Sequence, residues 1–390
     1  MQKTEAVSWR KKLKAKQLGI NAPLIFKTSH VQSPISQNLY DEAMISNAFL
    51  NDFNKDYFNL SFLTRSAAVR DLIRNNSTQE KGNAFCLQAQ GHKVHGTFFD
   101  RGSSYLMIVT GGFSNNHEYM ASFIKLFPHY DLVLFDLPGH GLDSAYPTSV
   151  MAKLGLAIVG VDLSVVSLGE KEANTISTVV DYFKMKRSYR TVVGVARCYS
   201  APFFAQAAVQ WQQNNASPLF DKLIIDSAFP SFDRMALNFP RLFCSKSNAP
   251  VWRHISLTWL VKTSFVALAN LFLTTKLYDC LPISHYLSQL HNTDLFFIHS
   301  TRDVAISMED FDSIWQQLGS IENKAVLFTH NKHALNHVKQ KELFKCCCEL
   351  FIESAWHNFS TTMIGIPKIE TAPVDLADQQ LRFPLHSLTK

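Results

Sequence analysis

The chain has 390 residues, of which 46% are hydrophobic, 18% charged and 12% aromatic. The low charge and the 30 Phe residues exclude a disordered chain, and at about 150 residues per domain the length allows two or three domains. Seven cysteines, an odd number in so long a chain, do not make a disulfide framework. We therefore expect reduced thiols and a cytoplasmic protein.

The net charge of +6 comes from the first 30 residues, where seven Lys and Arg residues accompany a single Glu. The rest of the chain is neutral, which argues against a basic face that binds nucleic acid. The basic head, Trp9–Lys16, has two interpretations: a solvated helix end, which we favour, or peripheral contact with an anionic membrane surface. No apolar segment of the signal-peptide kind follows it.

From residue 83 onward, short apolar runs that end at Gly or Pro alternate with helical patterns. The predicted strands are Asn83–Gln90 and His92–Asp100 (joined by a tight turn at Gly91), Tyr105–Thr110, Leu132–Phe135, Thr191–Val195, Lys222–Asp226, Asp294–His299 and Lys324–Thr329. The predicted helices between them include Glu118–Phe127 and Ala173–Met185. This alternation predicts an α/β fold with a mostly parallel, doubly wound sheet.

Composition shifts divide the chain into five predicted parts. They are an N-terminal helical extension (1–82), the first part of the core (83–229), a helical lid (230–289), the second part of the core (290–358) and a C-terminal tail (359–390), extended or disordered from Ile366. Within the lid, Ile255–Thr275 is long enough to span a membrane. Its polar residues and its place between two sheet strands favour a lid over a span.

Three sharp turns follow predicted strands, at Val109–Phe113, Phe135–Gly141 and Val193–Pro202. In this order they resemble three motifs of the α/β-hydrolase superfamily: the oxyanion loop, the D-x-P-G-x-G turn, and the G-x-S-x-G turn that carries the nucleophile. The resemblance covers Asn83–Phe229 and Leu290–Asn358. It implies that family's sheet with a lid inserted in it, and an acyl hydrolase that needs no cofactor.

The third turn, which we call the elbow (Ala196–Ser200), departs from the family pattern. Cys198 stands where the family has serine, and Ala196 and Ser200 replace the flanking glycines but are small enough for the turn. A thiol is a suitable nucleophile because an imidazole, a helix N-terminus or the cationic Arg197 can activate it. Ser200 is the fallback nucleophile, disfavoured because Pro202 would stiffen its turn. The alternative interpretation of Cys198 is a small buried hydrophobic residue.

The carboxylate that orients the catalytic histidine follows a later strand in this family, and Asp303 falls at that position by resemblance. Asp226, at the end of the preceding strand, is the fallback. Asp303 has a structural alternative, as the cap of a helix that starts near Met308.

The base should lie in the loop before the last helix. This selects His333, with His337 and then His330 ranked after it. By resemblance, the backbone N–H groups of Phe113 and Tyr199 would form the oxyanion hole.

Other candidate sites carry less weight. His333 and His337 are four residues apart and could share a metal, but no HExxH pattern is present and we expect no metal. Cys346–Cys348 span about 200° of a helix and cannot form one metal face, so we expect one or two of them in the core, with S-acylation as the minor alternative. The sequence contains no nucleotide-binding motif, and we expect no cofactor.

These observations predict an acyl hydrolase of the esterase, lipase or thioesterase type with a Cys198–His333–Asp303 triad. The aromatic lid, with Trp252, Trp259 and Phe265, suggests an apolar acyl or lipid substrate. Two alternatives stay open: an acyltransferase with the same triad, and an inactive member of the fold that binds a partner or a membrane surface.

Overall fold

The computed structural model describes residues 82–141, 161–236, 238, 280–359 and 381–382, apart from 114, 116, 163, 302, 304, 320, 330–332 and 335. The basic head, the N-terminal extension, most of the predicted lid and most of the tail therefore lie outside the described residues. So does the apolar segment 255–275. None of the helices in the described ranges is long and apolar enough to cross a membrane.

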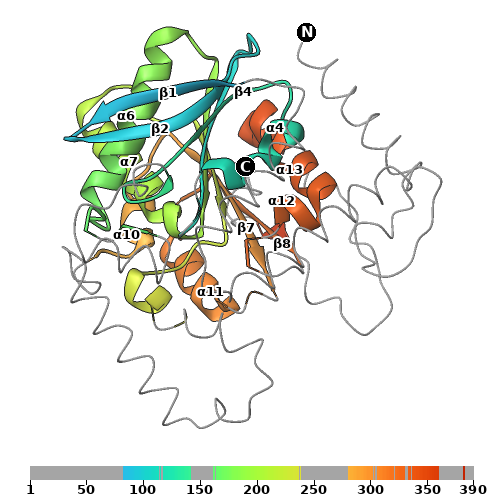
Figure 1. The fold of residues 1–390 in the computed structure, drawn as a ribbon. Helices are drawn as coiled ribbons and strands as arrows, with labels where there is room; N and C mark the ends of the chain where they lie inside the picture. Colours follow the sequence, from blue (N-terminus) through green and yellow to red (C-terminus); the bar gives the residue numbers. More distant parts are fainter. Residues whose placement is uncertain are drawn as a thin grey trace.

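Within the described residues, nine strands form a single sheet in the order β1-β2-β4-β3-β5-β6-β7-β8-β9 (Figure 1). Their bounds are β1 Asn83–Ala89, β2 His92–Phe99, β3 Tyr105–Thr110, β4 Asp131–Phe135, β5 Thr191–Arg197, β6 Lys222–Asp226, β7 Asp294–Ser300, β8 Lys324–Thr329 and β9 Leu381–Arg382. Strands β4, β3, β5, β6, β7 and β8 pair with one another in parallel, in that order. The pairs β1–β2, β2–β4 and β8–β9 in the described sheet are antiparallel. The predicted mostly parallel sheet is confirmed.

Helices cover both faces of the sheet (Figure 1). One face packs against α6 (Glu170–Lys186), α7 (Ala201–Asn214), α10 (Ile283–Leu287) and α11 (Met308–Gln317). The other packs against α4 (Ser122–Leu126) and α13 (Lys341–Glu353), with η2 (His117–Met120) and α12 (Asn336–Lys339) beside them. Because both faces are covered, the central strands β4, β5, β6 and β8 are buried along their whole length, which explains their continuous apolar runs.

Local chemistry sets several of these elements. The β1–β2 hairpin turns at Gln90 and Gly91, both at positive φ (38° and 85°), as a two-residue hairpin turn requires, which confirms the turn predicted at Gly91. The single helix predicted over 118–127 is instead two short pieces, η2 and α4, separated by Ala121. In α13, Cys347 and Cys348 are buried in the core, as predicted for one or two of the three.

The predicted tail forms a structured contact at one point. Residues 381–382 form β9, which adds a short antiparallel strand beside β8. At these two residues the predicted tail is extended. Strand β8 is thereby paired on both sides, with β7 and with β9.

A single buried carboxylate links several segments at the amino ends of the parallel strands. Asp131, at the start of β4, accepts hydrogen bonds from the backbone N–H groups of Arg101 (2.8 Å) and Ser103 (3.0 Å). Its second oxygen accepts from Arg187 (2.6 Å) and from the Tyr189 hydroxyl (3.0 Å). Four donors satisfy this fully buried carboxylate, as burial of a charge demands.

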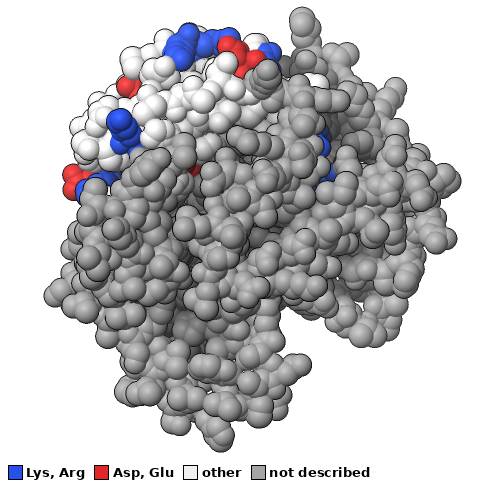
Figure 2. Space-filling model, in the orientation of Figure 1, with Lys and Arg blue, Asp and Glu red and all other residues white. Residues whose placement is uncertain are grey.

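Exposed charges of both signs lie near one another on the described part of one face. Figure 2 shows Lys and Arg side chains beside Asp and Glu side chains on the described part of that face. This agrees with the balanced composition of the chain beyond its basic head.

Candidate active site

The elbow lies where β5 passes through the 3-10 turn η4 (Cys198–Ser200) into α7. Cys198 has φ = 46°, a left-handed conformation that costs a residue other than glycine on the order of 1–3 kcal/mol. Ala196 and Ser200 on either side are completely buried, whereas Cys198 is partly exposed. The strand that leads into the elbow is closely packed: a Cβ on Gly194 in β5 would come within 2.8 Å of Leu223 Cδ1. The strained turn therefore presents the Cys198 thiol at the carboxyl end of the sheet.

Ser200, the fallback nucleophile, has a structural place in the elbow. Its Oγ accepts a hydrogen bond from the Arg197 N–H at 2.8 Å and donates to the Arg197 carbonyl at 3.0 Å. Both contacts close the turn around Cys198, and the side chain is completely buried. The geometry thus does not present this hydroxyl for attack.

Asp303 and His333 are brought together by the loops that follow β7 and β8. His333 Nδ1 lies 2.7 Å from Asp303 Oδ2. The other oxygen, Asp303 Oδ1, accepts from the N–H groups of Ala305 (2.9 Å) and Ile306 (3.0 Å), which fixes the carboxylate. The alternative of Asp303 as a helix cap is wrong, because Ser307 is the residue that caps α11.

The electrostatics of this pair favour the charged forms. Burial by itself would lower the pKa of His333, but the Asp303 carboxylate and the neighbouring Cys198 outweigh it and hold that pKa well above its ordinary value. Burial would likewise raise the pKa of Asp303, but the attraction and hydrogen bond of His333 lower it. The interaction with Cys198 contributes to the raised pKa of His333, which indicates that the thiol lies near the imidazole.

The remaining fallback residues lie elsewhere. Asp226, fully buried at the end of β6, accepts from the Asn336 amide at 2.8 Å and lies 3.6 Å from the Arg197 guanidinium. His337 is buried and stacks on Phe123, with ring centroids 5.5 Å apart. Burial, reinforced by the positive charge of Arg197, places the pKa of His337 well below its ordinary value.

The loop after β3 lies against the elbow. A Cβ on Gly112 would come within 3.6 Å of Cys198 Cβ and 3.8 Å of the Arg197 carbonyl, so the two backbones approach closely. Next to this contact, the rings of Phe113 and Tyr199 pack edge to face at 5.2 Å. The loop of Phe113 and the turn of Tyr199, the residues named for an oxyanion hole, are therefore adjacent.

The turn Asp136–Gly141 has a structural place. Asp136 accepts from the His117 N–H at 2.6 Å, and its second oxygen lies 2.9 Å from His117 Nδ1. Gly141 lies so close that a Cβ would come within 2.0 Å of Asp136 Oδ2, and its φ is 61°. We assign this turn no chemistry.

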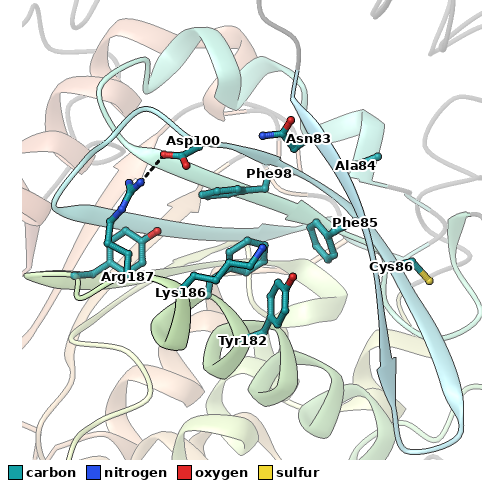
Figure 3. Close-up of a pocket in the computed structure, with 11 residues that line it drawn as sticks. Asn83, Ala84, Phe85, Cys86, Phe98, Asp100, Tyr182, Lys186 and Arg187 are labelled. Atoms are coloured by element: carbon teal, nitrogen blue, oxygen red, sulfur yellow. Dashed lines mark hydrogen bonds and ion pairs between the residues drawn. The ribbon is translucent and has the colours of Figure 1, made fainter.

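The described residues hold no group of three or more side chains arranged to bind a metal ion. A cavity of about 600 Å³ opens between β1, the end of β2 and α6 (Figure 3). It contains none of the site residues, and its Arg187 is paired with Asp100 at 2.9 Å, while Lys186 lies over the Tyr182 ring at 4.3 Å. This cavity therefore does not coincide with the candidate site at the carboxyl ends of the strands.

Sequence reasoning missed the side chains that hold the His333 loop. Ser227 donates to Asp226 and accepts from the Ala334 N–H, and Asn336 bridges Asp226 and Thr329. Their only sequence signal is their position just after predicted strands. Small polar residues are common there, so the signal does not single them out.

Comparison with known proteins gives neither a matching family model nor a matching curated protein. Among solved structures, an esterase of Pyrococcus furiosus is 16% identical, with a TM-score of 0.52 over 71% of this chain and 92% of that chain. A 2,6-dihydroxy-pseudo-oxynicotine hydrolase is 12% identical, with a TM-score of 0.50 over 87% and 85%. At such identities the likeness concerns the fold. With the strand order and the elbow, it shows that this chain has the α/β-hydrolase fold.

Proposed function

We propose that the chain is an acyl hydrolase that uses Cys198 as nucleophile, His333 as general base and Asp303 as the carboxylate that orients the histidine. The observation that carries the proposal is the convergence of three separate loops. A strained elbow presents a thiol beside an imidazole whose other nitrogen lies 2.7 Å from a buried carboxylate. This is the arrangement of an activated nucleophile, its base and an orienting group.

In the first half of the reaction, His333 Nε2 takes the proton of the Cys198 thiol, and the thiolate beside the charged imidazole then attacks the acyl carbonyl carbon. The carbonyl oxygen then carries the negative charge, and the N–H groups of Phe113 and Tyr199 would stabilise it. One such donor contributes about 3 kcal/mol in enzymes of this kind. When the bond to the leaving group breaks, His333 returns the proton to it and an acyl-thioenzyme remains.

In the second half, His333 takes a proton from a water molecule that attacks the acyl-thioenzyme. The C–S bond breaks, the Cys198 sulfur regains its proton from His333, and the carboxylic acid leaves. Asp303 keeps Nδ1 protonated throughout and so leaves Nε2 as the acceptor. No oxidant or metal is needed in either half.

An apolar acyl group suits the surroundings of the elbow. Tyr199 packs against Phe113, Phe203 and Phe232 at centroid distances of 5.2, 4.9 and 5.9 Å. Tyr199, Phe203 and Phe232 are buried in the core, whereas Phe113 is partly exposed and would favour the acyl chain of an ester or thioester over a charged substrate.

The test is hydrolysis of p-nitrophenyl esters and acyl thioesters from two to sixteen carbons. The purified wild type is compared with Cys198→Ala and, as matched control, with Cys86→Ala, which removes an exposed thiol on β1. We expect Cys198→Ala to lower kcat by at least about 10³-fold and Cys86→Ala to leave it unchanged. Intact-mass measurement should show the acyl group on the wild type and on Cys86→Ala but not on Cys198→Ala.

Two results would contradict the proposal. Turnover that survives in Cys198→Ala would exclude the thiol as nucleophile. An acyl-enzyme that resists water but passes its acyl group to an added alcohol or amine would favour acyl transfer, the second activity that the same site allows.

A further inference from the structure

Arg197, the residue before the proposed nucleophile, reaches from the elbow into the loop of His333. Its Nη2 donates to the carbonyl of Ala334, its Nη1 lies 3.1 Å from the Met120 sulfur, and its Nε lies 3.6 Å from Asp226 Oδ2. The side chain is only 5% exposed. A buried guanidinium thus joins the loops that carry the nucleophile and the base.

Ala334 directly follows His333 and is held in a strained conformation, with φ = 49°. Its N–H donates to Ser227 Oγ at 3.1 Å, and its carbonyl accepts from Arg197. Both polar groups of this residue are therefore fixed by side chains from other loops. Strained residues persist only where their surroundings over-determine them, so these contacts set the backbone direction at His333.

The same network closes the loop. Asn336 donates to Asp226 Oδ1 at 2.8 Å, and its carbonyl oxygen accepts from Thr329 Oγ1 at 2.5 Å. Thr329 and Asn336 lie on the two sides of the His333 loop, and Asp226 ends β6. The carboxylate that could have been the triad acid instead anchors the loop and balances the Arg197 charge.

The electrostatics show that this arrangement is costly. Burial lowers the pKa of Arg197 even though Asp226 raises it, and burial raises the pKa of Asp226 even though Arg197 lowers it. A buried ion pair is often no more stable than apolar residues of the same volume, so stability alone is a poor reason for it. A role in geometry accounts for the pair better.

We propose that Arg197 is a positioning residue that, through Ala334 and together with Asp226, holds His333 at the distance where it activates Cys198. The inference rests on the proposed function, since it assumes that His333 activates this thiol. The pair would act on the chemical step rather than on substrate affinity. Misplacing a catalytic group by about 1 Å can cost about 100-fold in rate.

The test measures alkylation of the Cys198 thiol by iodoacetamide from pH 5 to 9, with the modified peptide quantified by mass spectrometry. This readout needs no substrate. The proteins are the wild type, His333→Ala, Arg197→Lys and the neutral double variant Arg197→Met with Asp226→Asn. Lysine keeps the charge beside Asp226 but lacks the planar fork of arginine. The double variant leaves no unpaired buried charge, which guards against misfolding.

The matched control is Arg101→Lys. Arg101 also donates to backbone carbonyls, those of Phe127 (2.9 Å), Tyr130 (2.8 Å) and Ile124 (3.2 Å), but at the amino ends of the strands. Urea unfolding of each variant gives its stability. An arginine that merely holds the fold together would behave as Arg101 does, with a lower unfolding midpoint and an unchanged alkylation profile.

We expect Arg197→Lys and the double variant to alkylate Cys198 about 10- to 100-fold more slowly at pH 7 and to follow the His333→Ala profile, while remaining folded. In substrate assays kcat should fall and KM should stay. Folded variants that keep the wild-type profile would overturn the positioning role and leave the proposed function intact. A wild-type profile equal to that of His333→Ala would overturn the proposed function itself, and this inference with it.

Discussion

The amino and carboxyl ends of the parallel strands differ in charge pairing and in backbone strain. At the amino ends, charges are satisfied: Asp131 has four donors, and Lys222 donates to Asp294 and to the Ser354 carbonyl, both at 3.0 Å. At the carboxyl ends, Cys198, Ser227 and Ala334 all have positive φ (46°, 58° and 49°).

This difference shows at which end of the strands the fold tolerates backbone strain. Each strained residue costs on the order of 1–3 kcal/mol, and three of them follow β5, β6 and β8. In open α/β sheets the carboxyl ends of the strands are where ligands bind. The strained residues therefore lie at the end of the sheet where a ligand would bind.

The largest expected effect comes from Asp303→Asn at the carboxyl end of β7. We expect kcat to fall about 10³- to 10⁴-fold, because the amide no longer orients His333 or stabilises its charged form. The Asp303 carboxylate helps hold the pKa of His333 above 6.5, so the wild-type rate should decline as pH falls through a midpoint above 6.5. In the variant that midpoint should move to lower pH.

The control is the same chemical change at the other end of the same strand. Asp294→Asn removes a carboxylate that pairs with Lys222 at the amino end of β7. It should leave kcat and its pH dependence as in the wild type. An unmoved midpoint in Asp303→Asn, measured as kcat/KM from pH 5 to 9, would exclude Asp303 as the orienting group.

The sequence predicted the strands of the sheet closely. Buried strands such as 222–226 and 324–329 are continuous apolar runs bounded by polar residues, and both were located to the residue. The helix over 118–127 was predicted too long, because helical spacing does not reveal the break at Ala121. Hydrophobic periodicity indicates which residues are buried, and the buried runs identify the strands of the sheet.

The site depends on contacts between distant loops, which a sequence pattern does not encode. Asp226 and Asp303 both follow predicted strands, and only the structure separates the anchor of a loop from the partner of His333. Arg197 was noted as a nearby positive charge, but its contact with the Ala334 carbonyl lies 137 residues away in sequence. The roles of Cys198, Asp303 and His333 stay predictions until the thiol is tested.

A smaller effect is expected at the amino end, from Asp131→Ala. The change leaves the N–H groups of Arg101 and Ser103 and the Tyr189 hydroxyl without their acceptor. We expect a loss of about 2–4 kcal/mol in the free energy of unfolding, measured by urea denaturation. kcat per folded molecule should be unchanged. A fall in kcat larger than about threefold would show that the amino ends of the strands affect the proposed active site at the carboxyl ends.

The smallest effect is expected from a change at His299, which lies near the carboxyl end of β7. Its ring is completely buried and stacks on Phe311 at 4.8 Å, and neither ring nitrogen has a hydrogen-bond partner among the described residues. Burial lowers the pKa of His299 from 6.5 to about 4, against the opposing influence of Asp303 and with help from His333. His299 is therefore neutral in the folded protein where the unfolded chain is protonated.

The sign of the pH dependence follows from this. Between pH 6.5 and about 4 the unfolded state binds more protons at this position, so His299 makes the protein less stable as pH falls. His299→Phe keeps the stacking on Phe311 and removes the titration. Relative to the wild type it should therefore gain about 2 kcal/mol in the free energy of unfolding at pH 4.5 compared with pH 7.5. Parallel urea midpoints for the two proteins over this range would show that the imidazole is not neutral in the fold. His299 would then not be a neutral, unsatisfied group near the carboxyl ends of the strands.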